Sequence, residues 1–132
     1  MRFNSPQDYI EKIVSIKLSY YDTKKSQISY KSRPGLIIGC ENSQFPCDFT
    51  YLPISKITYE SRRHSIYDCE LNAHHCKVLN LHHHPSFIRC HKVSTIYCNQ
   101  VNKIIISNLE EMNPEIYKEI KSIFDNFIKQ LF

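Results

Sequence analysis

The sequence predicts a mainly β protein of the α+β class, with an antiparallel sheet followed by a C-terminal amphipathic helix. Short apolar runs are bounded by Gly, Pro, Asn and Ser, which is typical of strands joined by turns. Towards the C-terminus the apolar residues adopt helical spacing, from Ile116 to Leu131. With 132 residues, 42% of them hydrophobic, the chain is expected to form a single domain, 1–132, with its own core.

The first strand is expected at Ile13 to Tyr20, where apolar and polar residues alternate. The residues before it, Ser5 to Tyr9, fit either a helix start or an extended arm. The residues after it, Asp22 to Ser32, are polar and predict a connection without regular structure. This connection is either a solvated loop or a surface for phosphate contacts, in which case the contacting residues are Lys24, Lys25 and Lys31.

Two further strands are expected at Leu36 to Ile38 and at Phe49 to Ile54. Arg33 precedes the first run and Ser55 closes the second, so antiparallel pairing would bring both to one rim of the sheet. A guanidinium beside a hydroxyl suits a phosphodiester, because Arg offers a planar fork to phosphate oxygens and Ser supplies a hydrogen bond or a proton relay. The alternatives are that Arg33 is an ordinary surface charge and that Ser55 is a turn former.

The segment from Lys56 to Arg63 is basic and polar, with an aromatic residue between the charges. Aromatic rings interleaved with cations suit the stacking of unpaired bases beside phosphate contacts. A solvated hairpin tip is the alternative. The residues expected to contact nucleic acid here are Lys56, Tyr59, Arg62 and Arg63.

All seven histidines lie between His64 and His91, together with three of the six cysteines. Imidazole and thiolate are preferred zinc ligands, so a zinc-dependent hydrolase is one alternative. No Cys-x-x-Cys pair occurs, and we therefore expect neither a metal nor another cofactor. Because imidazole can serve as an acid or a base near pH 7, His64 and His91 are possible acid/base residues. The alternation from Cys76 to Leu81 predicts a strand.

The remaining elements are two strands and the terminal helix. One strand is expected from Pro85 through to Ile96, and another from Lys103 to Ser107. Asn113 is expected to cap the helix, Pro114 to take its first position, and Glu115 to face the positive end of the helix dipole.

Composition bounds the environment and the partners. Met1 to Asn4 opens no apolar signal segment and no run approaches transmembrane length, so we expect a cytoplasmic protein with free thiols and no membrane contact. The net charge of +4 suits a polyanionic partner without identifying one.

Several of these pieces, in this order, resemble the MazF/PemK family of bacterial toxin endoribonucleases. The resemblance covers roughly two thirds of the chain, and Glu11-Lys12 stands where the family usually carries Gly-Asp. The pieces that carry it are the turn Lys31-Ser32-Arg33-Pro34 with Leu36 to Ile38, then Leu52 to Ser55, His91 to Ile96, Lys103 to Leu109 and the terminal helix.

The resemblance implies a small, strongly bent antiparallel sheet or SH3-like barrel, acting as a homodimer. It implies the toxin of a type II toxin–antitoxin system, silenced by a cognate antitoxin protein. Such a toxin is a metal-independent endoribonuclease that cleaves single-stranded mRNA at preferred short sequences by transesterification.

The resemblance also assigns roles to residues. Arg33 would stabilise charge on the scissile phosphoryl group, and Ser55 would orient the phosphate or pass a proton. Asp22 to Ser32 would form a flap over the RNA. A non-catalytic nucleic-acid-binding or protein-interaction module on the same scaffold is the alternative.

Overall fold

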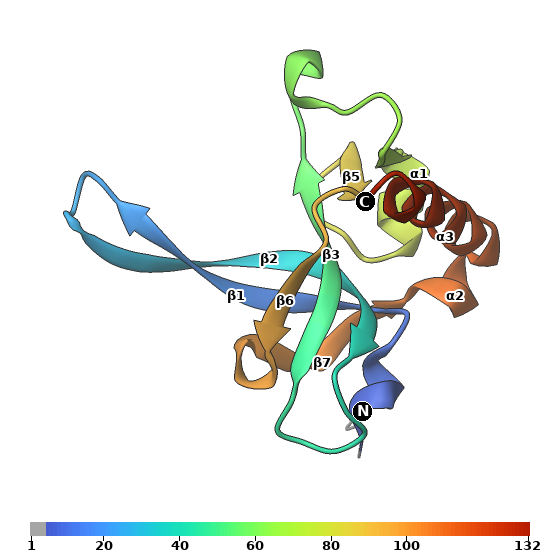
Figure 1. The fold of residues 1–132 in the computed structure, drawn as a ribbon. Coiled ribbons are helices and arrows are strands. Elements are labelled where there is room, and N and C mark those ends of the chain that lie inside the picture. Colours follow the sequence, from blue (N-terminus) through green and yellow to red (C-terminus); the bar gives the residue numbers. More distant parts are fainter. Residues whose placement is uncertain (1–4) are drawn as a thin grey trace.

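The computed structural model describes residues 5–132, so the N-terminal residues Met1 to Asn4, where no signal segment is expected, lie outside the described part. The fold is mainly β, as predicted: a strongly curled antiparallel sheet forms a half-barrel, and helices lie at one side of it (Figure 1). The strand order is β4-β5-β3-β2-β1-β7, and β6 pairs separately with β3.

The elements have the following bounds. The strands are β1 (Lys12–Asp22), β2 (Gln27–Cys40), β3 (Asp48–Lys56), β4 (Asp68–Leu71), β5 (Ser86–Arg89), β6 (Ser94–Tyr97) and β7 (Val101–Asn108). The α-helices are α1 (Ala73–Val78), α2 (Leu109–Met112) and α3 (Pro114–Lys129). The short 3-10 helices are η1 (Pro6–Tyr9), η2 (Glu60–Arg62) and η3 (Cys98–Gln100).

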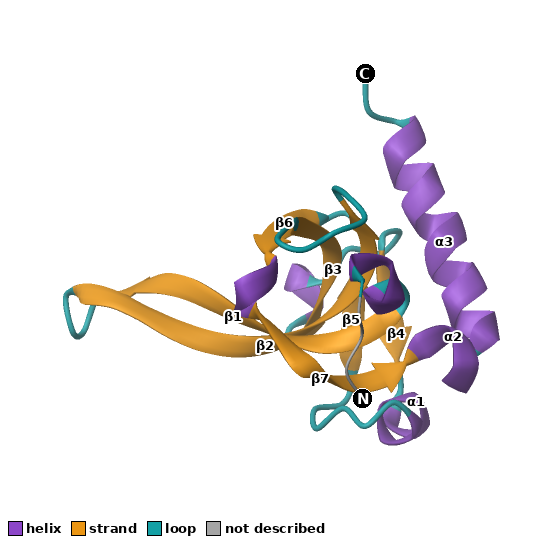
Figure 2. Ribbon diagram, turned by 90° about the horizontal axis from the view of Figure 1, so that it is seen from below, coloured by secondary structure: helices purple, strands orange, loops and turns teal. Residues whose placement is uncertain are grey.

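Strands β1 and β2 form a long hairpin, and its outer part, residues 18–32, projects from the body as an arm (Figures 1 and 2). The expectation of an irregular connection from Asp22 to Ser32 is therefore wrong. Asp22 closes a tight turn, because its Oδ1 accepts hydrogen bonds from the backbone N–H groups of Lys24 (3.0 Å) and Lys25 (3.3 Å). With the turn fixed, the polar residues on either side pair as strands.

The two faces of the sheet bury separate cores, since successive strand residues point to opposite faces. One face, here called the helix face, includes Ile13, Leu36 and Leu52 and packs against residues of α2 and α3. The other, here called the Tyr51 face, also carries Ile37 and packs against η1 and the segment after β2. Helices thus cover one face and leave much of the other to loops.

Helix α3 begins as the sequence predicts. Asn113 Oδ1 accepts a hydrogen bond from the backbone N–H of Ile116 (3.1 Å), and Pro114 occupies the first turn. Ile116 and Ile120 are buried against the helix face of the sheet, whereas Ile128 is exposed. The first half of the apolar stripe therefore anchors the helix.

The strand expected from Cys76 to Leu81 is wrong, because the first half of this stretch lies in α1 and the second half forms the turn after it. Asn72 caps the helix by accepting a hydrogen bond from the backbone N–H of His75 (2.9 Å). At the other end Asn80 takes a positive φ of 58°, and the N–H of Leu81 returns to the carbonyl of Cys76 (2.8 Å). Start and stop signals at both ends outweigh a short apolar alternation.

The single strand expected from Pro85 to Ile96 is also wrong. The chain leaves β5 after Arg89, turns, and re-enters the sheet as β6. β5 pairs with the end of β3 and β6 pairs with its beginning, so the turn at 90–93 is a corner of the curled sheet. Sheet curvature, which short apolar patterns do not encode, divides this segment.

Substituting Ile120 tests the anchoring of α3. Ile120→Ala should lower the free energy of unfolding by about 2–5 kcal/mol, because it leaves a cavity between the helix and the sheet. Ile128→Ala is the matched control on the same helix, where the side chain is 42% exposed and the loss should be much smaller. Denaturant unfolding measures both, and equal losses would contradict this packing.

Candidate functional site

Arg33 and Ser55 lie at the same end of the β2–β3 pair. Gly35 of β2 pairs with Pro53 of β3. Arg33 lies two residues before Gly35 and Ser55 two residues after Pro53, so both side chains are on the Tyr51 face. Beyond this point the two strands separate. Arg33 pairs with Ile16 of β1, and Ser55 with a residue of β5.

Neither candidate side chain is engaged by another side chain within residues 5–132. Arg33 is exposed, and its hydrogen bond among the described residues runs from Nη1 to the carbonyl of Ser32 (3.4 Å). Ser55 is half-buried, and its hydroxyl has no hydrogen-bond partner within residues 5–132. Both groups are therefore available to a phosphate.

The arm combines cations with exposed aromatic rings on both of its sides. On one side Lys31 Nζ lies 5.4 Å from the ring centre of Tyr20. On the other side Lys17 Nζ lies 4.6 Å from the ring centre of Tyr30. Arg33 shares the first side, since Ile16–Arg33 and Leu18–Lys31 are neighbouring pairs on alternate positions. Lys24 and Lys25 form the tip.

The loop after β3 presents the second predicted group of cations. Lys56, Tyr59 and Arg62 are exposed, and the Arg62 guanidinium lies 5.5 Å from the ring centre of Tyr59. Arg63 turns inward instead: it lies over the Phe87 ring (5.0 Å) and pairs with Glu70 (3.4 Å). Arg63 thus contacts the protein itself.

Arg33 and Ser55 stand where these two basic segments meet the sheet. In Figure 1 the arm extends to the left and the loop after β3 rises at the top. Arg33 lies at the base of the arm, and Ser55 directly precedes the loop. A polyanion that contacted both segments would pass this junction.

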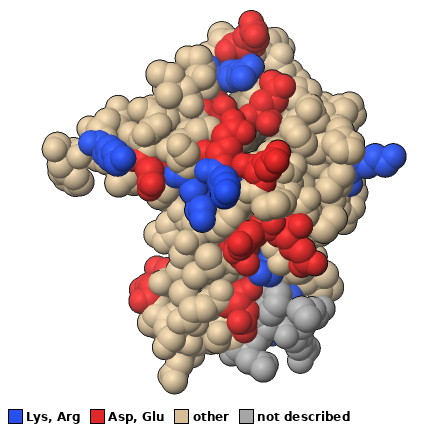
Figure 3. All heavy atoms as spheres, turned by 90° about the vertical axis from the view of Figure 1, so that its right-hand side faces the viewer, with Lys and Arg blue, Asp and Glu red and all other residues tan. Residues whose placement is uncertain are grey.

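The helices present a different charge pattern. On the side of the molecule that carries them, acidic and basic side chains are intermixed (Figure 3). Helices α2 and α3 together hold five acidic and three basic residues, whereas residues 17–33 hold five basic residues and one acidic residue. The arm is therefore better suited to a polyanion than the helical side.

A buried carboxylate, which the sequence analysis missed, orders the loop before β4. The Asp68 side chain is 0% exposed and accepts hydrogen bonds from the backbone N–H of His64 (2.7 Å) and from Arg89 Nε (3.0 Å). Arg89 also donates to the carbonyl of Arg62 (3.1 Å). The sequence carries no local signal for it, because Asp68 and Arg89 are 21 positions apart and meet only through the pairing of β4 with β5.

The same network brings together the two histidines proposed as acid/base residues. The ring centres of His64 and His91 lie 4.8 Å apart, and Tyr67 stacks on His64 at 4.7 Å. His64 Nδ1 accepts hydrogen bonds from the backbone N–H groups of Ile66 (3.2 Å) and Tyr67 (3.1 Å), so the neutral ring carries its proton on Nε2.

The surroundings of His91 favour its neutral form. Its Nδ1 is buried 3.7 Å from Asp68 Oδ1 and has no hydrogen-bond partner among the described residues. Burial lowers the pKa of His91 and outweighs the opposing effect of Asp68, while Arg89 and His64 lower it further. The register of β3 and β5 places this pair beyond Arg89, away from Ser55.

The other histidines and the cysteines do not form a cluster of metal ligands. His74 and the run His82 to His84 are exposed, and His75 caps α1. Burial raises the pKa of Cys69 and Cys90 to about 12, which keeps both thiols protonated. Within residues 5–132 no three His, Cys, Asp or Glu side chains are grouped so that they could hold a metal ion. No helix in this range is long and apolar enough to cross a membrane.

Removing Arg89 tests the buried pair. Arg89→Met should destabilise the fold by about 3 kcal/mol, because it leaves the Asp68 carboxylate buried with too few partners. Arg62→Met is the control, since only the backbone carbonyl of Arg62 joins the network. Unfolding in urea measures both variants, and a loss no larger than that of the control would show that the pair contributes little.

The pKa of His91 predicts a pH dependence of stability. Because folding lowers this pKa below its usual 6.5, the unfolded chain binds the proton first, so stability should fall as the pH drops below about 6.5. His91→Asn should reduce that slope, by at most about 1.4 kcal/mol per pH unit. His82→Asn, at an exposed position, should leave it unchanged. Unfolding midpoints of the wild type and both variants, measured between pH 5 and 8, give these slopes. The same slope in His91→Asn as in the wild type would show that His91 is solvated.

Comparison with known proteins gives no match: no protein-family model fits the chain, and no curated protein and no solved structure is significantly similar to it.

Proposed function

We propose that this protein binds single-stranded RNA and cleaves it by metal-independent transesterification. The observation that carries the proposal is the position of Arg33 and Ser55 on one face and at one end of the β2–β3 pair. The guanidinium of Arg33 has no acidic partner, and the hydroxyl of Ser55 has no hydrogen-bond partner, among the described residues. On either side of them lie the basic, aromatic arm and the loop after β3. Cations with exposed rings are what unpaired nucleotides bind.

The chemistry would need little beyond positioning and charge stabilisation. The 2′-oxygen attacks the neighbouring phosphorus, the bond to the 5′-oxygen breaks, and the products are a 2′,3′-cyclic phosphate and a 5′-hydroxyl. Arg33 would bind the phosphoryl oxygens, where negative charge develops. Ser55 would orient the phosphate and pass the 2′-proton to solvent, from which the leaving oxygen takes one. His64 and His91 would order the loop rather than act as acid or base.

A backbone feature supports the resemblance on which this mechanism depends. Glu11 has a φ of 71°, a left-handed conformation that glycine adopts readily and other residues rarely adopt. The MazF/PemK family usually carries Gly at this position. Glu11 N–H donates to the carbonyl of Ile37 (2.8 Å), and its own carbonyl accepts from Leu109 (3.1 Å), which holds the conformation.

The proposal extends to the partners of such a toxin. We propose that it acts on mRNA in the cytoplasm as the toxin of a type II pair. A cognate antitoxin with an acidic segment would compete with RNA for the arm. A homodimer would form through exposed apolar residues, Ile128 at the end of α3 and Leu131 just after it.

The alternative is a nucleic-acid-binding module without catalysis. Its support is that the lysines and tyrosines of the arm could bind nucleic acid whether or not Arg33 and Ser55 contact the same phosphate. The Arg33 guanidinium bonds within its own strand, and no contact joins it to Ser55 among the described residues.

Cleavage of a long single-stranded RNA in excess EDTA tests the proposal. The wild type should cut and leave cyclic phosphate ends. Arg33→Ala should slow cutting about a hundredfold or more, since it removes a donor from the developing charge. Ser55→Ala should slow it as well. The matched controls are Lys118→Ala and Ser122→Ala, exposed positions on α3. Gel assays with mapped product ends measure the rates.

The outcomes separate the two candidates. Cutting that both controls retain and Arg33→Ala loses supports the ribonuclease. Salt-dependent RNA binding without cutting, lost on removing Lys24 and Lys25 but not Arg33, indicates the binding module. A folded wild type that neither binds nor cuts RNA overturns both.

A further inference from the structure

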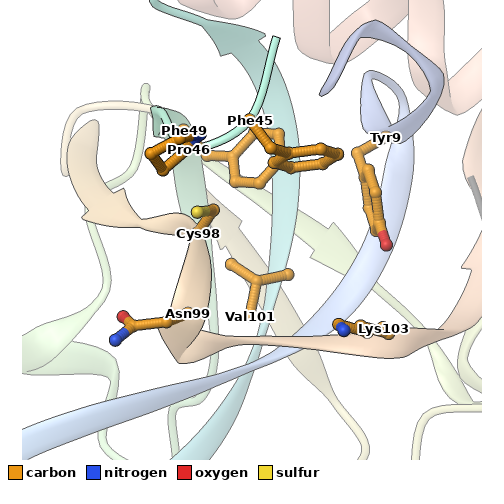
Figure 4. A pocket seen from close by; sticks show the side chains of 8 residues that line it. All are labelled: Tyr9, Phe45, Pro46, Phe49, Cys98, Asn99, Val101 and Lys103. Atoms are coloured by element: carbon orange, nitrogen blue, oxygen red, sulfur yellow. The ribbon is translucent and has the colours of Figure 1, made fainter. Parts of the chain in front are cut away.

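A pocket of about 510 Å³ opens at the other end of the Tyr51 face, where β3 begins (Figure 4). It is enclosed by three segments far apart in the sequence: η1, the loop between β2 and β3 with the start of β3, and η3 with the start of β7. Its volume lies in the range of small-molecule sites. Nothing in the mechanism proposed above uses it.

Three aromatic rings wall one side of the pocket. The ring centre of Tyr9 lies 5.4 Å from that of Phe49 and 6.2 Å from that of Phe45, and the rings meet edge-on or tilted. Tyr9 and Phe49 are buried, whereas Phe45 is 42% exposed. Val101 points towards the rings from β7 (Figure 4). The space between therefore has one aromatic and one aliphatic wall, which suits a flat ring.

Polar groups stand on either side of Val101 (Figure 4). Lys103 is exposed and forms no ion pair within residues 5–132. Asn99 Oδ1 accepts a hydrogen bond from the Gln100 amide (3.2 Å), which leaves the Asn99 N–H groups free to donate. The pocket thus offers a positive charge and an amide donor beside an apolar slot.

We propose that this pocket binds one nucleotide unit, with the base in the slot against Phe45 and Val101 and the phosphate at Lys103. A flat heteroaromatic ring uses the walls, its acceptors use Asn99, and its phosphate neutralises Lys103. An uncharged aliphatic ligand would leave the cation unpaired, and a free phosphate would leave the aromatic walls empty.

The unit belongs either to a free nucleotide or to RNA, and the second case rests on the proposed function. Phe49 and Ser55 are six residues apart on β3, about 20 Å at the usual rise of a strand. The pocket would then hold a nucleotide remote from the scissile phosphate and contribute to sequence preference there.

Calorimetric titration of the full chain with AMP, GMP, CMP, UMP and inorganic phosphate tests the pocket directly. At least one nucleotide should bind saturably, one per chain, about tenfold or more tightly than inorganic phosphate. Phe45→Ala and Lys103→Gln should each weaken it about tenfold. Ile104→Ala, on the same strand but outside the pocket lining, and Lys118→Gln on α3 should not. Thermal melting checks that each variant is folded.

Each result decides between named outcomes. Absence of saturable nucleotide binding to the folded wild type, or equal binding by the pocket variants and their controls, overturns the proposal. Displacement of the nucleotide by a single-stranded RNA places the unit within RNA, whereas RNA that binds without displacing it identifies a free nucleotide as the ligand. Nucleotide binding by a chain that neither binds nor cuts RNA leaves the pocket established and the proposed function overturned.

Discussion

Strand β3 is the element on which the rest of the structure depends, because its two edges serve three neighbours. β2 runs along one edge, and β6 and β5 divide the other edge between its beginning and its end. The strongly curled sheet packs the side chains of Ile16 and Tyr51 directly over Gly35, where no larger residue has room. A Cβ atom there would lie 2.5 Å from Ile16 Cδ1 and 3.1 Å from Tyr51 Cδ2. Both candidate sites lie on this curled strand, one at each end.

The sequence predicts those elements in which the pattern of apolar residues matches the residues that the fold buries. Ile13 to Tyr20 alternates because Val14, Ile16 and Leu18 all pack on the Tyr51 face, and α3 is signalled by its cap and by its apolar stripe. The arm could not be predicted this way, since neither of its sides is buried and its strands exist through mutual pairing. Likewise α1 is decided by Asn72 and Asn80 at its ends rather than by the residues between them.

The candidate sites were predictable only where one assumption about strand pairing was enough to place the residues. Arg33 and Ser55 were placed at one end of the sheet from a single assumption, antiparallel pairing, which the register of β2 and β3 satisfies. His64 and His91 are 27 positions apart, and their contact depends on Asp68 pairing with Arg89 across β4 and β5. The pocket beside Phe45 draws on three separate segments, around residues 9, 45–49 and 98–103. No local pattern contains that information.

Two of the arginines contribute to folding, whereas the cations of the proposed sites do not. Arg89 and Arg63 each face a carboxylate within the sheet, so their charges contribute to folding and are offset there. Arg33, the lysines of the arm and Lys103 have no acidic partner within residues 5–132. Unpaired cations close together repel one another, and a bound polyanion removes that cost while releasing its own counterions. Lys118 and Lys129 of α3 have no acidic partner in this range either, so a missing partner alone does not mark a binding site. What distinguishes the cations of the arm and Lys103 is the aromatic rings beside them, which is why the proposals above place phosphates there.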